Sequence, residues 1–130
     1  MLLAGYVEEF LFRGLLFTAM LREGRAKTAI IVSALTFGIG HILNLFTGQN
    51  VPETLVQIVF AVAWGLIFTL VFYKGGSLIP CVIAHSMIDV FSVINVDDNM
   101  TASILFIGAT ILLGGAYCAY LARIPGNKLT

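Results

Sequence analysis

Six ionisable side chains of this 130-residue chain lie inside long apolar stretches, and two of them are the only histidines of the chain. An ionisable side chain at membrane depth costs about 3 kcal/mol, so a single one indicates either a functional group or a structural ion pair between helices. Six with complementary chemistry favour a functional site. The six are Glu8, Glu9, Arg13, His41, His85 and Asp89.

Helical spacing predicts which of these side chains are neighbours. Glu9 and Arg13 are four residues apart, so on an α-helix they share a face and can form an ion pair. Glu8 is rotated by about 100° from Glu9 and is left to point elsewhere. His85 and Asp89 are also four residues apart, so the carboxylate can orient the imidazole and fix its tautomer. We therefore expect one free carboxylate, that of Glu8, to face two imidazoles.

A carboxylate with two histidines suggests two kinds of chemistry. In the first, Glu8, His41 and His85 bind Zn²⁺ or another divalent metal and leave a coordination position for water. In the second, no metal takes part, Glu8 is the general base on a water and the histidines stabilise an oxyanion. The HExxH signature of zinc proteases is absent, and both hypotheses stay open. Cys81 and Cys118 are isolated, which disfavours nucleophilic cysteine catalysis.

The composition indicates which elements must position these side chains. Apolar residues make up 59% of the chain and charged residues 11%, about half the charge of an average soluble domain. Lys plus Arg and Asp plus Glu balance at 7 each, which excludes a nucleic-acid binder and leaves a membrane protein. The remaining charges, Asp97 and Asp98 among them, mark loops between five apolar stretches of membrane-spanning length. These stretches are residues 1–21, 28–46, 54–73, 77–94 and 101–122. The sequence thus predicts an all-α fold, a polytopic membrane helical bundle of about five transmembrane helices in the lipid bilayer.

The loops also predict the depth of the site and the orientation of the chain. Glu8, His41 and His85 each lie about 17 to 21 Å from the nearest positively charged loop, at about 1.5 Å per residue, so helices in alternating directions bring them to nearly one level. Lys and Arg concentrate in the loop 22–27, at Lys74 and in the C-terminal tail, which predicts that these parts face the cytoplasm. The first residue then lies on the outer side. We therefore expect the chain to lack upstream N-terminal helices.

Three short motifs carry the six side chains. The sequence EEFLFRG at residues 8–14 resembles the EExxxR motif of the CAAX prenyl endopeptidase and bacteriocin-processing (CPBP, or Abi) family of intramembrane proteases. FGIGH at residues 37–41 is similar to the FxxxH motif of that family, and HSMID at residues 85–89 to its HxxxN/D motif. The motifs stand in the order of the family, each on its own predicted helix. Residues 1–130 thus resemble a single protease domain of this type, without the upstream helices.

The resemblance implies an intramembrane endopeptidase, similar to type II CAAX prenyl proteases, in which Glu8 activates the attacking water. It implies that Glu9 and Arg13 support this glutamate, and that His41, His85 and Asp89 complete the catalytic site. The family is described both as metalloproteases and as glutamate proteases. The implied substrate is a peptide or a prenylated protein, and the expected location is a bacterial plasma membrane, with several spans and a cytoplasmic C-terminus.

Two other classes of function use the same residue types. A non-catalytic bacteriocin self-immunity or membrane scaffold protein would keep the motifs and act by binding a partner. A proton or ion pathway also uses chains of carboxylates and histidines, but the sequence shows no inverted repeat and no paired broken helices of a transporter. The peptidase is the function that the sequence favours.

Overall fold

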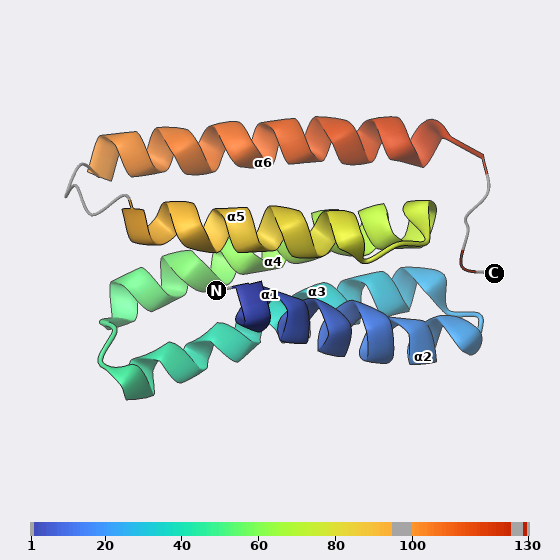
Figure 1. Ribbon diagram of the computed structural model, residues 1–130, viewed down its shortest axis with the longest axis horizontal. Coiled ribbons are helices and arrows are strands. Elements are labelled where there is room, and N and C mark those ends of the chain that lie inside the picture. The colour runs from blue at the N-terminus through green and yellow to red at the C-terminus, as the bar shows by residue number, and fades with distance from the viewer. Residues whose placement is uncertain (1, 95–99, 126–128, 130) are drawn as a thin grey trace.

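The computed structural model describes residues 2–94, 100–125 and 129, and nearly all of them are helical (Figure 1). The first helical run consists of α1 (Leu2–Glu9), η1 (Phe10–Phe17) and α2 (Thr18–Arg22), and the second of α3 (Ala26–Gly40) and η2 (His41–Thr47). They are followed by α4 (Val51–Gly75), α5 (Ile79–Ile94) and α6 (Met100–Arg123). The described residues contain no strand, so the predicted all-α fold of five helical segments is confirmed. Asp97 and Asp98, predicted to mark the fourth loop, lie outside the described residues.

Local sequence signals set the two ends of α4. Asn50 precedes its first residue, and the Asn50 side-chain oxygen accepts a hydrogen bond from the backbone N–H of Glu53 at 2.9 Å. Pro52 follows in the first turn, where a helix needs no backbone donor. At the other end Gly76 adopts a φ of 73°, a left-handed conformation that favours glycine, and its N–H donates to the carbonyl oxygen of Phe72 at 2.8 Å. These ends let the chain reverse sharply before and after α4.

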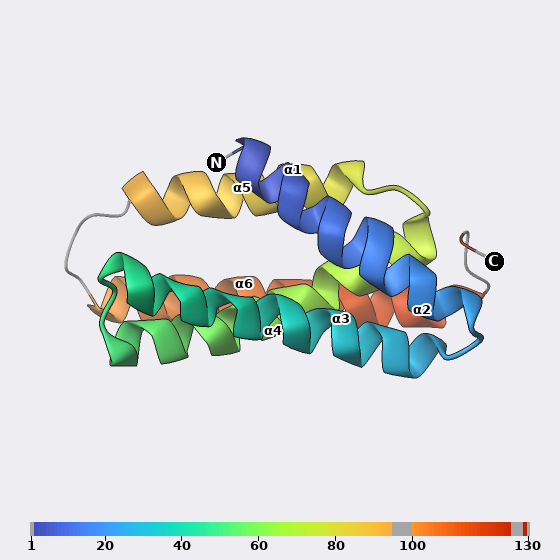
Figure 2. The same ribbon diagram turned by 90° about the horizontal axis from the view of Figure 1, so that it is seen from below.

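The helices are arranged in two layers, which Figure 2 shows from the side. One layer pairs α1 with α5. In the other, α4 is central, with α3 and η2 packed along one side of it and α6 along another. The segment η1 packs on α3 and so joins the first layer to the second. The three motifs, which lie on α1–η1, α3–η2 and α5, are thus brought around α4.

Two glycines let α3 and α4 approach each other closely. A Cβ atom added at Gly38 would lie 2.2 Å from Val62 Cγ2 and 2.9 Å from the Val62 backbone nitrogen, and one at Gly65 would lie 3.0 Å from Ala34 Cα. Small residues at helix crossings are typical of membrane bundles. At Gly40, by contrast, an added Cβ would meet nothing closer than 4.0 Å.

Beside a largely apolar core, the bundle buries charged side chains and exposes large apolar ones. Glu9 and Arg13 are completely buried, whereas large apolar side chains such as Phe46 face outward. Among the described residues, Ala26–Thr47 and Val51–Gly75 are long and apolar enough to cross a membrane, and α5 and α6 supply shorter apolar stretches. Buried, paired charges and exposed apolar side chains are compatible with a helical bundle in a bilayer.

The close contact between α3 and α4 predicts the effect of adding one methyl group. Gly38→Ala should lower the free energy of unfolding by about 1–3 kcal/mol, because the added Cβ meets the backbone of Val62 as well as its side chain. Gly115→Ala on α6 is the matched control, since nothing lies within 4 Å of a Cβ at that position. Denaturant titration in detergent micelles measures both values. Equal stability of the two variants would contradict the close approach described here.

Candidate active site

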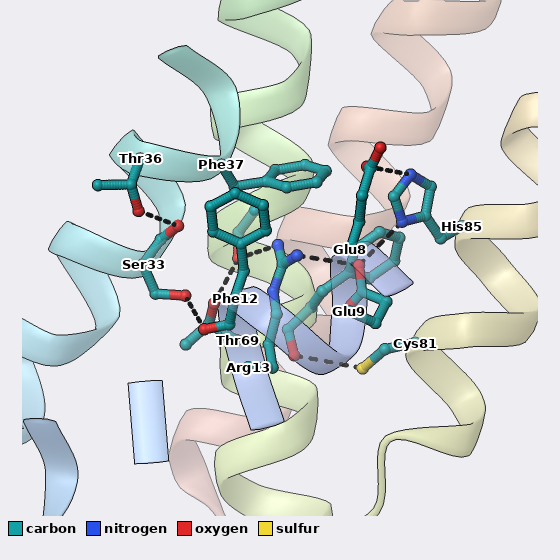
Figure 3. A network of polar contacts seen from close by, with 12 residues as sticks. Glu8, Glu9, Phe12, Arg13, Ser33, Thr36, Phe37, Thr69, Cys81 and His85 are labelled. Carbon is teal, nitrogen blue, oxygen red and sulfur yellow. Dashed lines mark hydrogen bonds and ion pairs between the residues drawn. The ribbon is translucent and has the colours of Figure 1, made fainter. Parts of the chain in front are cut away.

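Arg13 lies in the middle of η1 and is enclosed by three helices (Figure 3). Its Nη1 donates to Glu9 Oε1 at 2.9 Å, and its Nη2 donates to the carbonyl oxygen of Gly65 on α4 at 3.2 Å. The guanidinium carbon lies 4.3 Å from the ring centroid of Phe37 and 5.5 Å from that of Phe68. One carboxylate, one carbonyl and two ring faces thus stabilise the buried cation. The predicted ion pair between Glu9 and Arg13 is confirmed.

The segment that carries Arg13 is a π-helix, a feature that no pattern in the sequence predicts. A π-helix is wider than an α-helix, is rare, and occurs frequently at functional sites. Two hydroxyl groups bond to its carbonyl oxygens: Ser33 Oγ donates to Phe12 O at 2.8 Å and Thr18 Oγ1 donates to Arg13 O at 3.0 Å. Figure 3 shows Ser33 reaching from α3 to this segment. Both donors are ordinary residue types for a membrane helix, so neither signals a π-helix from the sequence.

The imidazole of His85 is surrounded by three carboxylates. Its Nδ1 lies 2.9 Å from Glu9 Oε1, which joins α5 to α1. Its Nε2 lies 3.5 Å from Glu8 Oε2 and 3.7 Å from Asp89 Oδ1. An ionised carboxylate only accepts hydrogen bonds, so Nδ1 carries a proton and donates it to Glu9. The spacing within α5 predicted that Asp89 orients this imidazole. That pair is present at Nε2, and Glu9 makes the shorter contact at Nδ1, because the packing of α1 on α5 places its carboxylate there.

The adjacent glutamates have different surroundings. Glu9 is fully buried and its Oε1 is shared between Arg13 and His85. The side chain of Glu8 is 39% exposed and approaches His85 from the Nε2 side, as Figure 3 shows. Glu8 is therefore the more accessible of the two glutamates. Its predicted partners were two imidazoles, and the described contacts give it one, that of His85.

His41 lies at the point where α3 becomes the 3₁₀-helix η2. Its Nδ1 donates to the carbonyl oxygen of Phe37 at 3.0 Å, which leaves Nε2 of the neutral ring as an acceptor. The ring of Phe37 packs edge-on against both imidazoles, with its centroid 5.2 Å from that of His41 and 5.5 Å from that of His85. Phe37, the first residue of the FxxxH motif, thus contacts both histidines.

A pocket of about 150 Å³ brings the remaining predicted residue into the same place. His41, His85 and Asp89 contribute its polar wall, and aromatic rings of α4, among them Trp64 and Phe68, contribute an apolar wall. A cavity of this volume accepts a group about the size of benzene. Side chains from η2, α4 and α5 therefore surround a space for a small part of a ligand beside the His85 imidazole.

The predicted metal ligands do not form a ligand set in this arrangement. Among the residues that the structure describes, no group of three or more His, Cys, Asp or Glu side chains could hold a metal ion. Glu8 and His85 are neighbours, but no contact of His41 with either is found there. Cys81 is buried in the core, where its Sγ–H donates to the carbonyl oxygen of Phe68 at 3.3 Å. The donor set as it stands does not fit a divalent metal, which needs three protein ligands around one point.

Comparison with known proteins supplies independent information on this set of residues. A model of the family described as type II CAAX prenyl endopeptidase, Rce1-like, matches residues 1–91. The matched range contains all three motifs and therefore every side chain of the site described above. No curated protein and no solved structure matches the chain.

The enclosure of Arg13 predicts a large loss of stability when its charge is removed. Arg13→Met should lower the free energy of unfolding by about 3–5 kcal/mol, because the Glu9 carboxylate stays buried without its counter-charge. Arg22→Met, at an exposed position near the end of the same helical run, should change it by less than about 0.5 kcal/mol. Chemical denaturation in micelles measures both.

A double variant separates lost charge balance from lost packing. Glu9→Gln combined with Arg13→Met removes both charges, so it should be more stable than Arg13→Met alone. A double variant that is no more stable than the single one would show that the ion pair is not the reason for the loss.

Proposed function

The chain belongs to the Rce1-like family of type II CAAX prenyl endopeptidases, a family of membrane-integral proteases, and on this basis we propose that it hydrolyses peptide bonds within the membrane by means of a water activated by Glu8. The observation that carries the proposal is the position of the His85 imidazole. Glu9 holds its Nδ1, Glu8 lies at its Nε2, and it borders a pocket shared with His41 and Asp89.

Glu8 is proposed as the general base because its carboxylate is the accessible one. It takes a proton from a water molecule, and the resulting hydroxide attacks the carbonyl carbon of the scissile peptide bond. Glu9 is unsuited to this step, since its bonded oxygen already accepts from Arg13 and His85 and the side chain is completely buried. The role we assign to Glu9 and Arg13 is to hold the site in shape.

His85 is proposed to stabilise the oxyanion that forms when the hydroxide attacks. With Nδ1 donating to Glu9, a protonated ring presents its Nε2–H towards Glu8, Asp89 and the pocket, where it can donate to the new negative charge. An ionised carboxylate cannot donate to an oxyanion, so Asp89 is assigned a different role. At 3.7 Å from Nε2 it balances the positive charge of the imidazolium.

The remaining proton transfers use groups that already line the site. The Nε2 acceptor of His41 faces no protein donor among the described contacts and can accept a hydrogen bond from the attacking water. Glu8 then returns the proton to the amide nitrogen as the C–N bond breaks, giving a carboxylic acid and an amine, and the acid proton passes to the amine to give a carboxylate and an ammonium group. The atoms balance with one water consumed, and no step requires a metal.

For the substrate, we infer a prenylated protein with a C-terminal CAAX sequence or a related membrane-bound peptide, in line with the family. The location we propose is a bacterial plasma membrane in which Lys74, the loop 22–27 and the C-terminus face the cytoplasm, as the distribution of positive charge favours. The competing class is a non-catalytic protein that binds a bacteriocin or another partner through the same residues.

The proposal predicts the result of removing the proposed base. Glu8→Gln should lower kcat for cleavage of a farnesylated CAAX peptide by about 100- to 10,000-fold, because the amide cannot take a proton from water. Its thermal unfolding midpoint should stay near that of the unmodified chain, since Glu8 is partly exposed. Glu53→Gln, at an exposed position of α4, is the matched control and should cleave normally. Full cleavage by Glu8→Gln would refute the assignment, and biological activity without any cleavage would favour the binding class.

The side-chain mechanism also predicts how a chelator acts. Cleavage by the full chain should persist after incubation with a strong chelator, because Glu8, His41 and His85 do not form a ligand set. Metal analysis of the active sample accompanies the rate measurement. Loss of cleavage that Zn²⁺ restores would instead mean that the three side chains converge on a metal in the working enzyme.

A further inference from the structure

Gln57 is a polar residue of α4 that none of the proposed catalytic steps uses, although it lines the same pocket as His41 and Asp89. Phe68, eleven residues further along α4, also lines this pocket and stacks on His85 with a centroid separation of 5.8 Å. Gln57 and the His85 imidazole therefore border one small space, which holds part of a bound ligand.

The carboxamide of Gln57 is oriented by Asn44. Asn44 Nδ2 donates to Gln57 Oε1 at 2.8 Å, which ties η2 to α4. With its oxygen engaged, Gln57 presents its NH₂ group, for which no hydrogen-bond partner is found among the described residues. Asn44 lies three residues after His41 in η2, so the same bond holds the helix that carries this histidine.

The neighbouring polar groups of the pocket supply acceptors. The O–H of Ser92 donates to the carbonyl oxygen of Asp89 at 2.8 Å, so the Ser92 hydroxyl oxygen can still accept a hydrogen bond. Neutral His41 offers a lone pair at Nε2, and the carboxylate of Asp89 is an acceptor as well. A peptide bound along this wall brings carbonyl oxygens that need donors, because an unpaired carbonyl in apolar surroundings costs free energy. The NH₂ group of Gln57 is suited to that need.

We propose that Gln57 is a substrate-positioning residue, and that its NH₂ group donates a hydrogen bond to a backbone carbonyl oxygen of the substrate peptide lying along α4. The inference rests on the proposed function. The ligand at this end of the pocket is then a stretch of polypeptide backbone. Gln57 recognises its carbonyl group and no particular side chain. Asn44 keeps the donor turned towards the pocket.

Steady-state cleavage of a farnesylated CAAX peptide by the full chain tests the donor role. Gln57→Leu should raise KM about tenfold and leave kcat nearly unchanged, since one neutral hydrogen bond made equally in the bound ground state and the transition state is lost. Gln49→Leu, the same change at a position outside the pocket, should leave KM unchanged. A normal KM for Gln57→Leu, or a fall confined to kcat, would overturn the proposal.

Gln57→Glu separates the donor role from the tether. A glutamate keeps an acceptor for Asn44 Nδ2 but has no N–H to offer, so its KM should rise at least as much as that of Gln57→Leu. If Gln57→Glu instead kept the KM of the unmodified chain, Gln57 would serve only to tie η2 to α4, and the proposal would be wrong.

Binding measured without cleavage distinguishes this inference from the proposed function. The dissociation constant of a fluorescein-labelled farnesylated CAAX peptide is compared between the full chain carrying Glu8→Gln and the chain carrying Glu8→Gln with Gln57→Leu. A tenfold rise in Kd supports the role of Gln57 even if the unmodified chain cleaves nothing, in which case only the proposed function fails. Equal values, or no binding by either, would refute the role of Gln57.

Discussion

The burial of Arg13 is the constraint on which the arrangement of this bundle depends. A guanidinium group without water needs an opposite charge and hydrogen-bond acceptors, since the desolvation penalty of a buried ion amounts to several kcal/mol. Glu9 supplies the charge from the same helix, Gly65 supplies a carbonyl from α4, and the ring of Phe37 supplies a face from α3. A single side chain therefore fixes three helices relative to one another. The absence of side chains at Gly38 and Gly65 lets α3 and α4 come close enough for this to happen.

The same constraint extends to the proposed reacting groups through Glu9. Its Oε1 accepts from Arg13 and also from His85, so the position of the imidazole on α5 follows from the position of the guanidinium on η1. Glu8 is the next residue along the chain and meets the other side of the same ring. The two adjacent glutamates thus differ in their surroundings, since Glu9 is enclosed by the helices and Glu8 is partly exposed. This difference depends on their different directions around α1 and needs no difference in residue type.

The sequence predicted those features that depend on local spacing. Charged residues marked the helix ends, and the four-residue separation of Glu9 and Arg13 predicted their ion pair. Features that depend on contacts between distant segments were missed. Spacing within α5 pointed to Asp89 as a partner of His85, and that pair is present, but a residue 76 positions away, Glu9, makes the shorter contact, at 2.9 Å from Nδ1. The carbonyl of Gly65 carries no signal, because every residue has a carbonyl and only the packing of α3 on α4 decides which one meets Arg13.

The π-helical segment η1 has a consequence for the rotational phase of the first helical run. The wider π-helix over Phe10–Phe17 contains more residues per turn than an α-helix without interrupting the helical run. The residues before and after this segment therefore do not follow one continuous 3.6-residue repeat. Shortening the segment by one residue would turn Glu8 and Glu9 by about 100° relative to α2. The number of residues between α1 and α2 thus sets how far the two ends of this helical run are rotated relative to each other. A deletion or an insertion would disturb the site more than most substitutions that keep the count.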